Sequence, residues 1–197
     1  MVATAQAAER FYRAADHSPP ATVRAAVRIE QGAALDWLPQ EAILFDGVSV
    51  DRALSVEMAA DARFVGIEML VFGRAAMGEV IRAGSLRDRI TVRRDARLLL
   101  HDAIRLDGKM AATLDRAAVG GGARAVATLV YVAPDAADRL DMLRTAFPAS
   151  VEAGASCWDG MVVARMLARD GAALRTAVVA ALSVLRDQRT LPRSWNL

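Results

Sequence analysis

The sequence has few of the residues that usually carry chemistry. Its 197 residues include one cysteine, Cys157, two histidines and a single lysine, Lys109, and aromatic residues make up only 5%. A lone cysteine excludes an internal disulfide and fits a reducing compartment. No apolar run reaches the roughly 18 residues of a membrane-spanning helix, and the first residues do not resemble a secretion signal. These absences predict a soluble cytoplasmic protein with no membrane partner.

The same scarcity narrows the enzymatic possibilities. His17 and His101 lack the paired spacing of a zinc-binding HExxH motif, and Cys157 has no CxxC partner. Residues 154–156 lack the second glycine of a nucleophile elbow, and the glycines at 120–122 are not followed by Lys-Ser/Thr as in a phosphate loop. We therefore predict no catalytic residue, no firm metal site and no tightly bound cofactor. The alternative in the enzyme class is a small hydrolase that uses Cys157 and His101.

Charge of both signs is spread through the chain. There are 25 basic and 23 acidic residues, which gives a net charge of +2. Because the basic residues are not interleaved with exposed aromatic residues, the sequence does not indicate a nucleic-acid platform. All basic residues except Lys109 are arginines, which favour forked pairing with carboxylates.

Short strand-like segments dominate the chain. Residues 23–29 and 48–58 alternate between apolar and polar side chains, and residues 64–72 form a continuous apolar run typical of a strand covered on both faces. Helical spacing follows Pro134 and Asp170. We predict one domain over residues 1–197 in the mainly β class. Its layered or β-helix-like sheets should be antiparallel-rich, with two peripheral α-helices toward the C-terminus.

The segment Leu35–Gly47, LDWLPQEAILFDG, contains three structural signals. Two apolar runs are separated by Pro39-Gln40-Glu41, and the second run ends at Asp46-Gly47, a strong signal for a tight turn. The pattern predicts a kinked core hairpin whose return arm is Val48–Met58.

Three charged residues lie on faces that are otherwise apolar: Arg52, Glu68 and Asp102. An unpaired buried charge costs several kcal/mol, so these side chains must pair, meet water or line a cavity. One interpretation is an internal salt bridge. The functional interpretation is a hydrated channel between sheet layers, in which carboxylate and water oxygens exchange a passing divalent metal.

Seven motifs occur along the chain in a family-like order. They are TAQAAERFYRA, LDWLPQEAILFDG, GRAAMGE, RRDARLLLHDAIRLDG, RAVATLVYVAPDA, ASCWDGMVVARMLA and LPRSW. Together they resemble the urease accessory protein UreD family, also called UreH. The resemblance implies a strand-rich, non-catalytic maturation factor, a chaperone that binds apo-urease together with UreF and the GTPase UreG. It also implies that nickel passes through the interior on its way to the urease active site.

The resemblance also suggests where partners bind. Trp37, Pro39, Gln40 and Glu41 match the second motif. The third motif is matched by Gly73, Arg74, Gly78 and Glu79. We expect these eight residues to shape the scaffold and its partner surface. Compared with the family, the chain is expected to lack the N-terminal strands, which leaves a non-functional truncated remnant as a further alternative.

Overall fold

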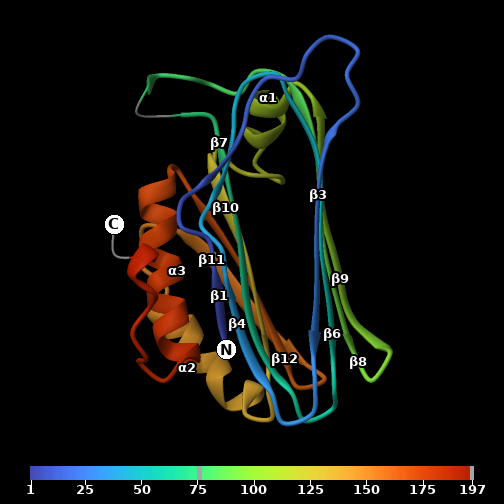
Figure 1. Ribbon diagram of the computed structural model, residues 1–197. Helices are drawn as coiled ribbons and strands as arrows, with labels where there is room; N and C mark the ends of the chain where they lie inside the picture. Colours follow the sequence, from blue (N-terminus) through green and yellow to red (C-terminus); the bar gives the residue numbers. More distant parts are fainter. Residues whose placement is uncertain (75–76, 196–197) are drawn as a thin grey trace.

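Two stacked β-sheets and two helices on one outer face make up most of the computed structural model, which describes residues 1–74 and 77–195 (Figure 1). Within the described residues, sheet 1 has eight strands and sheet 2 has four. The strands of sheet 1 are β1 (Val2–Thr4), β4 (Ala34–Leu38), β7 (Arg63–Phe72), β10 (Ala125–Val132), β12 (Met161–Ala168) and β11 (Glu152–Trp158), with β2 (Glu9–Phe11) and β5 (Ala42–Leu44) beside this path. Those of sheet 2 are β3 (Ala21–Ile29), β6 (Val48–Met58), β8 (Gly84–Arg94) and β9 (Arg97–Gly108).

The predicted mainly β class is confirmed, and so are the two helices toward the C-terminus. Helices α2 (Ala136–Ala146) and α3 (Gly171–Leu185) lie against the outer face of sheet 1 (Figure 1). Asp170 caps α3 as predicted, because its Oδ1 accepts a hydrogen bond from the Ala173 N–H at 2.8 Å. A short helix that the sequence did not indicate, α1 (Met110–Leu114), follows β9, and a 3₁₀ turn (Arg193–Trp195) lies near the end.

The sheets are less antiparallel than expected. Strands β1, β2, β4, β5 and β7 are joined in parallel, as are β3, β6 and β8. Among the described strands, antiparallel pairing joins the run β7–β10–β12–β11 and the β8–β9 hairpin. Parallel neighbours need crossover connections, and here successive strands pass from one sheet to the other as in a β-helix.

The predicted hairpin over Leu35–Gly47 is wrong. The segment forms β4 and β5, which both pair with β7 in parallel, and the expected return arm, β6, lies in the other sheet. The Asp46-Gly47 turn exists, with Gly47 at φ +80°, but it sends the chain into sheet 2. The Asp46 carboxylate accepts hydrogen bonds from the backbone of Arg82 and Ala83, which holds this crossing. A tight turn dipeptide indicates a reversal without determining which strand becomes the partner.

Other strand predictions hold with small differences. The inward positions of β6 are buried from Val48 to Met58, and β7 is buried on both faces, as predicted. On β9 a bulge opposite Val92 and Arg93 changes the facing, so that Leu99 is buried and Leu98 is exposed. Residues 3–12 form two short strands, β1 and β2. The predicted Gly73–Glu79 loop includes residues 75–76, and the predicted tail includes residues 196–197. These four residues lie outside the described part.

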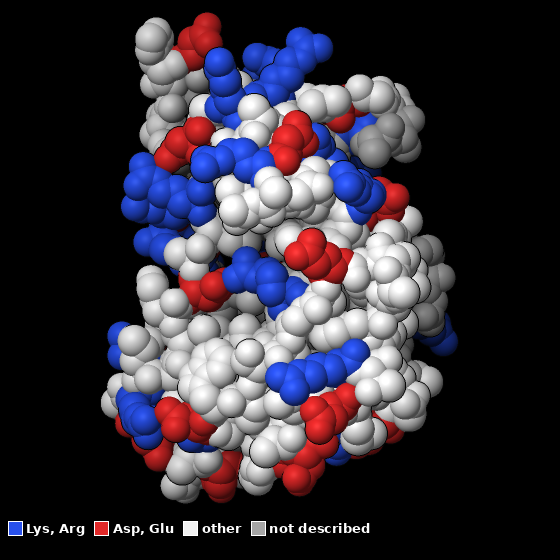
Figure 2. Space-filling model, turned by 180° about the vertical axis from the view of Figure 1, so that it is seen from behind, with Lys and Arg blue, Asp and Glu red and all other residues white. Residues whose placement is uncertain are grey.

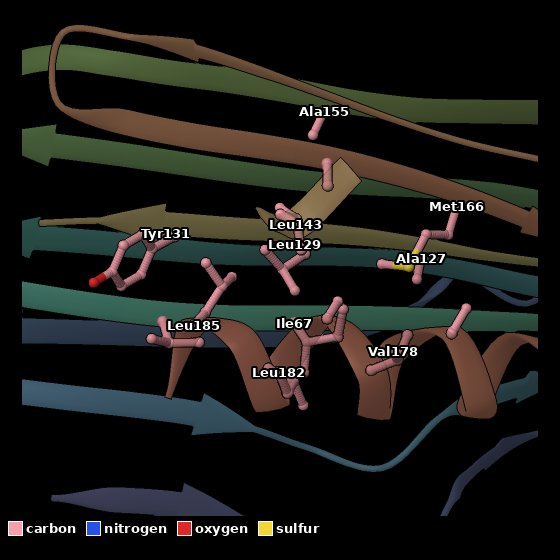
Figure 3. Close-up of a cluster of buried hydrophobic side chains, with 14 of the residues drawn as sticks. Ile67, Ala127, Leu129, Tyr131, Leu143, Ala155, Met166, Val178, Leu182 and Leu185 are labelled. Atoms are coloured by element: carbon pink, nitrogen blue, oxygen red, sulfur yellow. The ribbon is translucent and has the colours of Figure 1, made fainter. Parts of the chain in front are cut away.

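Apolar side chains gather in three clusters. The first lies between sheet 1 and the helices, where Val178, Leu182 and Leu185 of α3 face Ile67 and Leu129 (Figure 3). The other two lie between the sheets, one around Phe64 and Val130 and one around Leu70 and Leu86. The space between the sheets therefore holds two apolar cores, and what separates them is the candidate site.

Candidate functional site: a polar belt between the sheets

A row of polar side chains crosses the inter-sheet space between its two apolar cores. In sheet 2, Arg52 lies directly across from Asp88 in the strand register. In sheet 1, Glu68 lies opposite Thr128, which in turn lies opposite Arg165. The polar belt, as we call it, consists of Arg52 (β6), Asp88 (β8), Asp102 (β9), Glu68 (β7), Thr128 (β10) and Arg165 (β12).

The strand pattern places the belt. On β6, Val50 belongs to one apolar core and Leu54 to the other, with Arg52 between them. On β8, Asp88 similarly lies between Leu86 and Ile90. Because alternate residues of a strand point to the same face, the three belt residues of sheet 1 form one row of the register. In sheet 2 Arg52 lies opposite Asp88, whereas Asp102 lies opposite Ile90, two residues along β8 from Asp88.

Arg52 is the centre of the most buried part of the belt. Its Nη2 lies 2.6 Å from Oε2 of Glu68 on the opposite sheet, and its Nη1 lies 3.3 Å from Oδ1 of Asp88. The Trp37 indole N–H donates to Oε1 of Glu68 at 2.8 Å. Glu9, which is far more exposed, lies 3.9 Å from Arg52. Arg52 therefore links the two sheets and lies within ion-pair distance of three carboxylates.

The electrostatics of this cluster are uneven. Burial raises the pKa of Asp88 to about 6; Arg52 opposes this shift, and Glu68 and Asp102 add to it. Burial also acts to lower the pKa of Arg52, but Glu68 and Asp88 outweigh it and raise that pKa above its usual range. Two buried carboxylates thus share one guanidinium, and one of them takes up a proton close to neutral pH.

The other end of the belt is more open. Nη2 of Arg165 donates to both carboxylate oxygens of Asp102 at 2.7 Å. The side chains of Arg165 and Asp102 are 36% and 24% exposed, against 8% for Glu68. Near Glu9, at the opposite end, a hollow of ≈120 Å³ adjoins Arg52. The belt thus runs from one solvent-facing edge of the sheet pair to the other.

Sequence reasoning found three members of this belt and missed three. Arg52 and Glu68 form an internal salt bridge, which was one of the two interpretations of the sequence, while Asp102 pairs with Arg165. The missed residues are Asp88, Arg165 and Thr128. The rule that identified Arg52 would also have found Asp88, which alternates with Leu86 and Ile90, had the strand been extended before Ile90.

The two motif segments expected to contact partners meet at a second feature, a surface groove. This open hollow of ≈730 Å³ is lined by Glu41 from one motif and by Gly73, Arg74 and Met77 from the other, together with the first turn of α3. Met77 is 73% exposed. Segments more than 30 residues apart in the chain therefore share one surface.

The remaining motif residues hold this region together. Trp37 and Pro39 line the hollow beside Arg52 instead of the groove. Gln40 and Glu41 both accept from Arg175 of α3, at 2.9 and 3.4 Å. The Arg74 guanidinium lies over the Phe45 ring at 4.5 Å and pairs with Glu79 at 2.7 Å.

Glycine is required at Gly73 for a geometric reason. Its φ is +83°, and a Cβ there would lie 2.6 Å from the Glu79 carbonyl oxygen. Gly78 also has a positive φ, +68°, but has open space around it. The two glycines therefore shape the loop that borders the groove.

The residues of the alternative hydrolase are not joined. His101 is exposed on β9 of sheet 2, where its Nδ1 lies 3.0 Å from the Thr91 hydroxyl, and Cys157 is a half-buried free thiol on β11 of sheet 1. Within residues 1–74 and 77–195 no hydrogen bond connects them, and no group of three or more His, Cys, Asp or Glu side chains is arranged to hold a metal ion. His17 lies in the loop before β3.

The surface and the helices add two findings. Acidic and basic side chains are interspersed over the back of the molecule (Figure 2). Among the described helices, none is both long and apolar enough to cross a membrane.

These features define the class of protein: two strand-rich layers with a charged belt through the interior and helices on one outer face. The model of the UreD urease accessory protein family matches residues 1–196, and the chain belongs to that family. Urease accessory protein UreD of Methylobacterium sp. (strain 4-46) is 48% identical over 100% of this chain and 71% of its own length. The protein of the same name from Jannaschia sp. (strain CCS1) is 47% identical, over 100% and 72%. Urease accessory protein UreD 2 of Methylorubrum populi is 48% identical, over 98% and 65%.

Proposed function

We propose that this chain is a non-catalytic urease maturation factor. It works in the cytoplasm with UreF, the GTPase UreG and apo-urease, and nickel in transit to the urease active site passes along its polar belt. Membership of the UreD urease accessory protein family supports the role in maturation. The observation that carries the transit route is the belt itself, which brings buried carboxylates into a row with a solvent-facing edge at each end.

The belt suits transit because of its chemistry. Carboxylate and water oxygens bind divalent metals and exchange them readily when the site lacks a rigid, complete ligand set. Glu9, Glu68, Asp88 and Asp102 supply such oxygens at successive points between the two edges. A cation can thus move from one carboxylate to the next without crossing the apolar cores on either side.

Nickel delivery tests this route. The variant Glu68→Gln/Asp102→Asn keeps the shapes of both side chains and removes their charges. With UreF and UreG present, we expect its nickel-dependent activation of apo-urease to fall about tenfold or more, with pull-down of UreF and urease unchanged. The matched control, Glu57→Gln/Asp141→Asn, changes side chains that are 55% and 93% exposed and should activate normally. Normal activation by a belt variant that still binds both partners would contradict the route, whereas equal loss of activation and partner binding would indicate misfolding.

The groove is the proposed contact surface for a maturation partner. Exposed apolar side chains in a hollow bordered by arginines are typical of protein-binding sites. We expect Met77→Glu to weaken capture of UreF or apo-urease about tenfold, because it places a charge in that contact. Met142→Glu, at an exposed methionine on α2, is the control. If both variants bind UreF and urease like the unmodified chain, the groove is not the contact surface.

A further inference from the structure

Arg52 fills the space between two carboxylates that would otherwise face each other across the sheets. Its guanidinium contacts Glu68 of sheet 1 and Asp88 of sheet 2, and its side chain is only 9% exposed. In a protein interior a cation placed between two carboxylates neutralises them whether it belongs to a side chain or is a free ion. Arg52 therefore occupies the position that a passing cation would take.

The guanidinium fills this position incompletely. Its Nε is buried and, among the described residues, makes no hydrogen bond. Its contact with Asp88 is 3.3 Å long, whereas charge-assisted N–H···O bonds are typically about 2.7–2.9 Å. The charge balance is incomplete as well, since Glu68 and Asp88 bring two potential negative charges to one positive charge. A divalent ion would balance both negative charges completely.

A second buried arginine shows what a fully satisfied structural pair looks like in this chain. Arg186 at the end of α3 donates from Nε to Asp36 at 2.8 Å and from Nη1 to the carbonyl oxygens of Arg189 and Thr190. Its side chain is 3% exposed. This guanidinium faces one buried carboxylate and is anchored by backbone groups, which the Arg52 guanidinium is not.

There is room for Arg52 to move. The hollow of ≈120 Å³ beside it is lined by Glu9, Trp37 and Pro39, and it holds the volume of about four waters. Glu9 lies 3.9 Å from the guanidinium, on the exposed side. A shift of the side chain toward Glu9 would bring the guanidinium closer to that carboxylate and leave Glu68 and Asp88 facing a free space.

We propose that Arg52 is a displaceable internal counter-ion, which holds the place of a divalent cation between Glu68 and Asp88 and moves toward Glu9 when a cation enters. The proposal rests on the transit function proposed above and adds how the chain keeps the passing cation weakly bound. An entering ion competes with a tethered guanidinium, so it is bound weakly and passed on. Removal of the guanidinium converts this stretch of the belt from a point of passage into a point of retention.

Nickel binding to the purified, untagged full chain tests the proposal without urease or other partners. Arg52→Met removes the tethered charge and keeps much of the side-chain volume. We expect it to bind Ni²⁺ about tenfold or more tightly than the unmodified chain by equilibrium dialysis, and its thermal midpoint to rise by several degrees with NiCl₂ in a saturable way. Arg186→Met is the matched control: it removes an equally buried guanidinium from a single carboxylate and should gain no such response.

Further variants keep the test decisive. In Arg52→Met/Glu68→Gln/Asp88→Asn the carboxylates are neutral as well, so this chain should fold without metal and lose the gain in Ni²⁺ binding. A folded Arg52→Met chain that binds Ni²⁺ no better than the unmodified chain would overturn the proposal. So would an Arg52→Met chain that stays unfolded even in millimolar NiCl₂ while the triple variant folds. Failure of the proposed function would show differently, as an unmodified chain that does not promote activation of apo-urease.

Discussion

Sheet 1 is covered on both faces, and the two coverings differ in kind. On the helix side, leucine, valine and alanine side chains of α3 pack against β7, β10 and β12 (Figure 3). Among the described residues, the buried charges on this side are Arg186 and Asp36, which meet at one end. On the side of sheet 2, a polar belt divides the apolar packing into two cores. One face thus has the continuous core expected of an interface whose only task is stability, whereas the other leaves buried charges at its centre.

The comparison indicates which buried charges have a role other than stability. A pair such as Arg186 and Asp36, with backbone acceptors completing the guanidinium, is accounted for by packing alone. Around Arg52 an Nε has no acceptor among the described residues, and two carboxylates share one guanidinium. Buried polar groups that are only partly satisfied cost stability, so their presence calls for a reason other than folding.

The largest expected effect concerns the belt. Arg52→Met leaves Glu68 and Asp88 buried without their cation, and we expect the free energy of unfolding at pH 7 to fall by about 3–5 kcal/mol in metal-free buffer. Urea or guanidinium unfolding followed by circular dichroism measures the change. A loss below about 1 kcal/mol would mean that water already reaches these carboxylates, and the contrast between the two faces would weaken.

Leu182→Ala tests the apolar packing between sheet 1 and the helices. Leu182 is fully buried in the first apolar cluster, so its truncation should cost about 2–5 kcal/mol through lost burial and a residual cavity. Because no charge is involved, the loss should be the same at pH 5 and pH 7. A loss that changed with pH would show that the helix-side core is coupled to the belt.

The pH dependence of stability distinguishes the belt side of sheet 1 from its helix side more sharply. The folded-state pKa of Asp88 is raised from 3.8 to about 6, so the folded chain holds this proton more tightly than the unfolded chain. The resulting stabilisation is complete below about pH 4 and is lost as the pH rises through about 6. Asp88→Asn removes this titration. Its stability relative to the unmodified chain should therefore rise by roughly 2–3 kcal/mol between pH 4 and pH 7.

Unfolding curves of both chains at pH 4, 5.5 and 7 measure this relative change, and the titrations that they share cancel in the comparison. Parallel stability profiles would show that Asp88 titrates normally. In that case the belt would be more hydrated than its burial indicates.

The smallest effect belongs to the cap of α3. Asp170→Ala removes the acceptor for the Ala173 N–H, and we expect a loss of about 1 kcal/mol, measured by the same unfolding assay. Asp141→Ala, at a fully exposed position of α2, should stay within about 0.5 kcal/mol of the unmodified chain. If the cap variant also altered Ni²⁺ binding by Arg52→Met, the two faces of sheet 1 would not be independent.

Much of the local structure was predictable. Alternation identified β3 and β6, and a continuous apolar run identified β7, because these signals depend on neighbouring residues alone. The same alternation exposed Arg52 and Glu68 as inward charges. Pairing partners were harder. The segment Leu35–Gly47 was expected to pair with Val48–Met58, yet both of its strands pair with β7, the strand after that return arm.

The sequence by itself determined where most of the strands and the two long helices form, that three charges lie on otherwise apolar faces, and which family the motifs resemble. Each of these depends on side-chain periodicity or on local order along the chain. Only the tertiary structure decided that Glu68 meets Arg52, that Asp102 pairs with Arg165, and that two separate motifs share one groove. The reason is physical: strand register across two sheets arises from long-range pairing, and a one-residue shift would turn every belt residue to the opposite face.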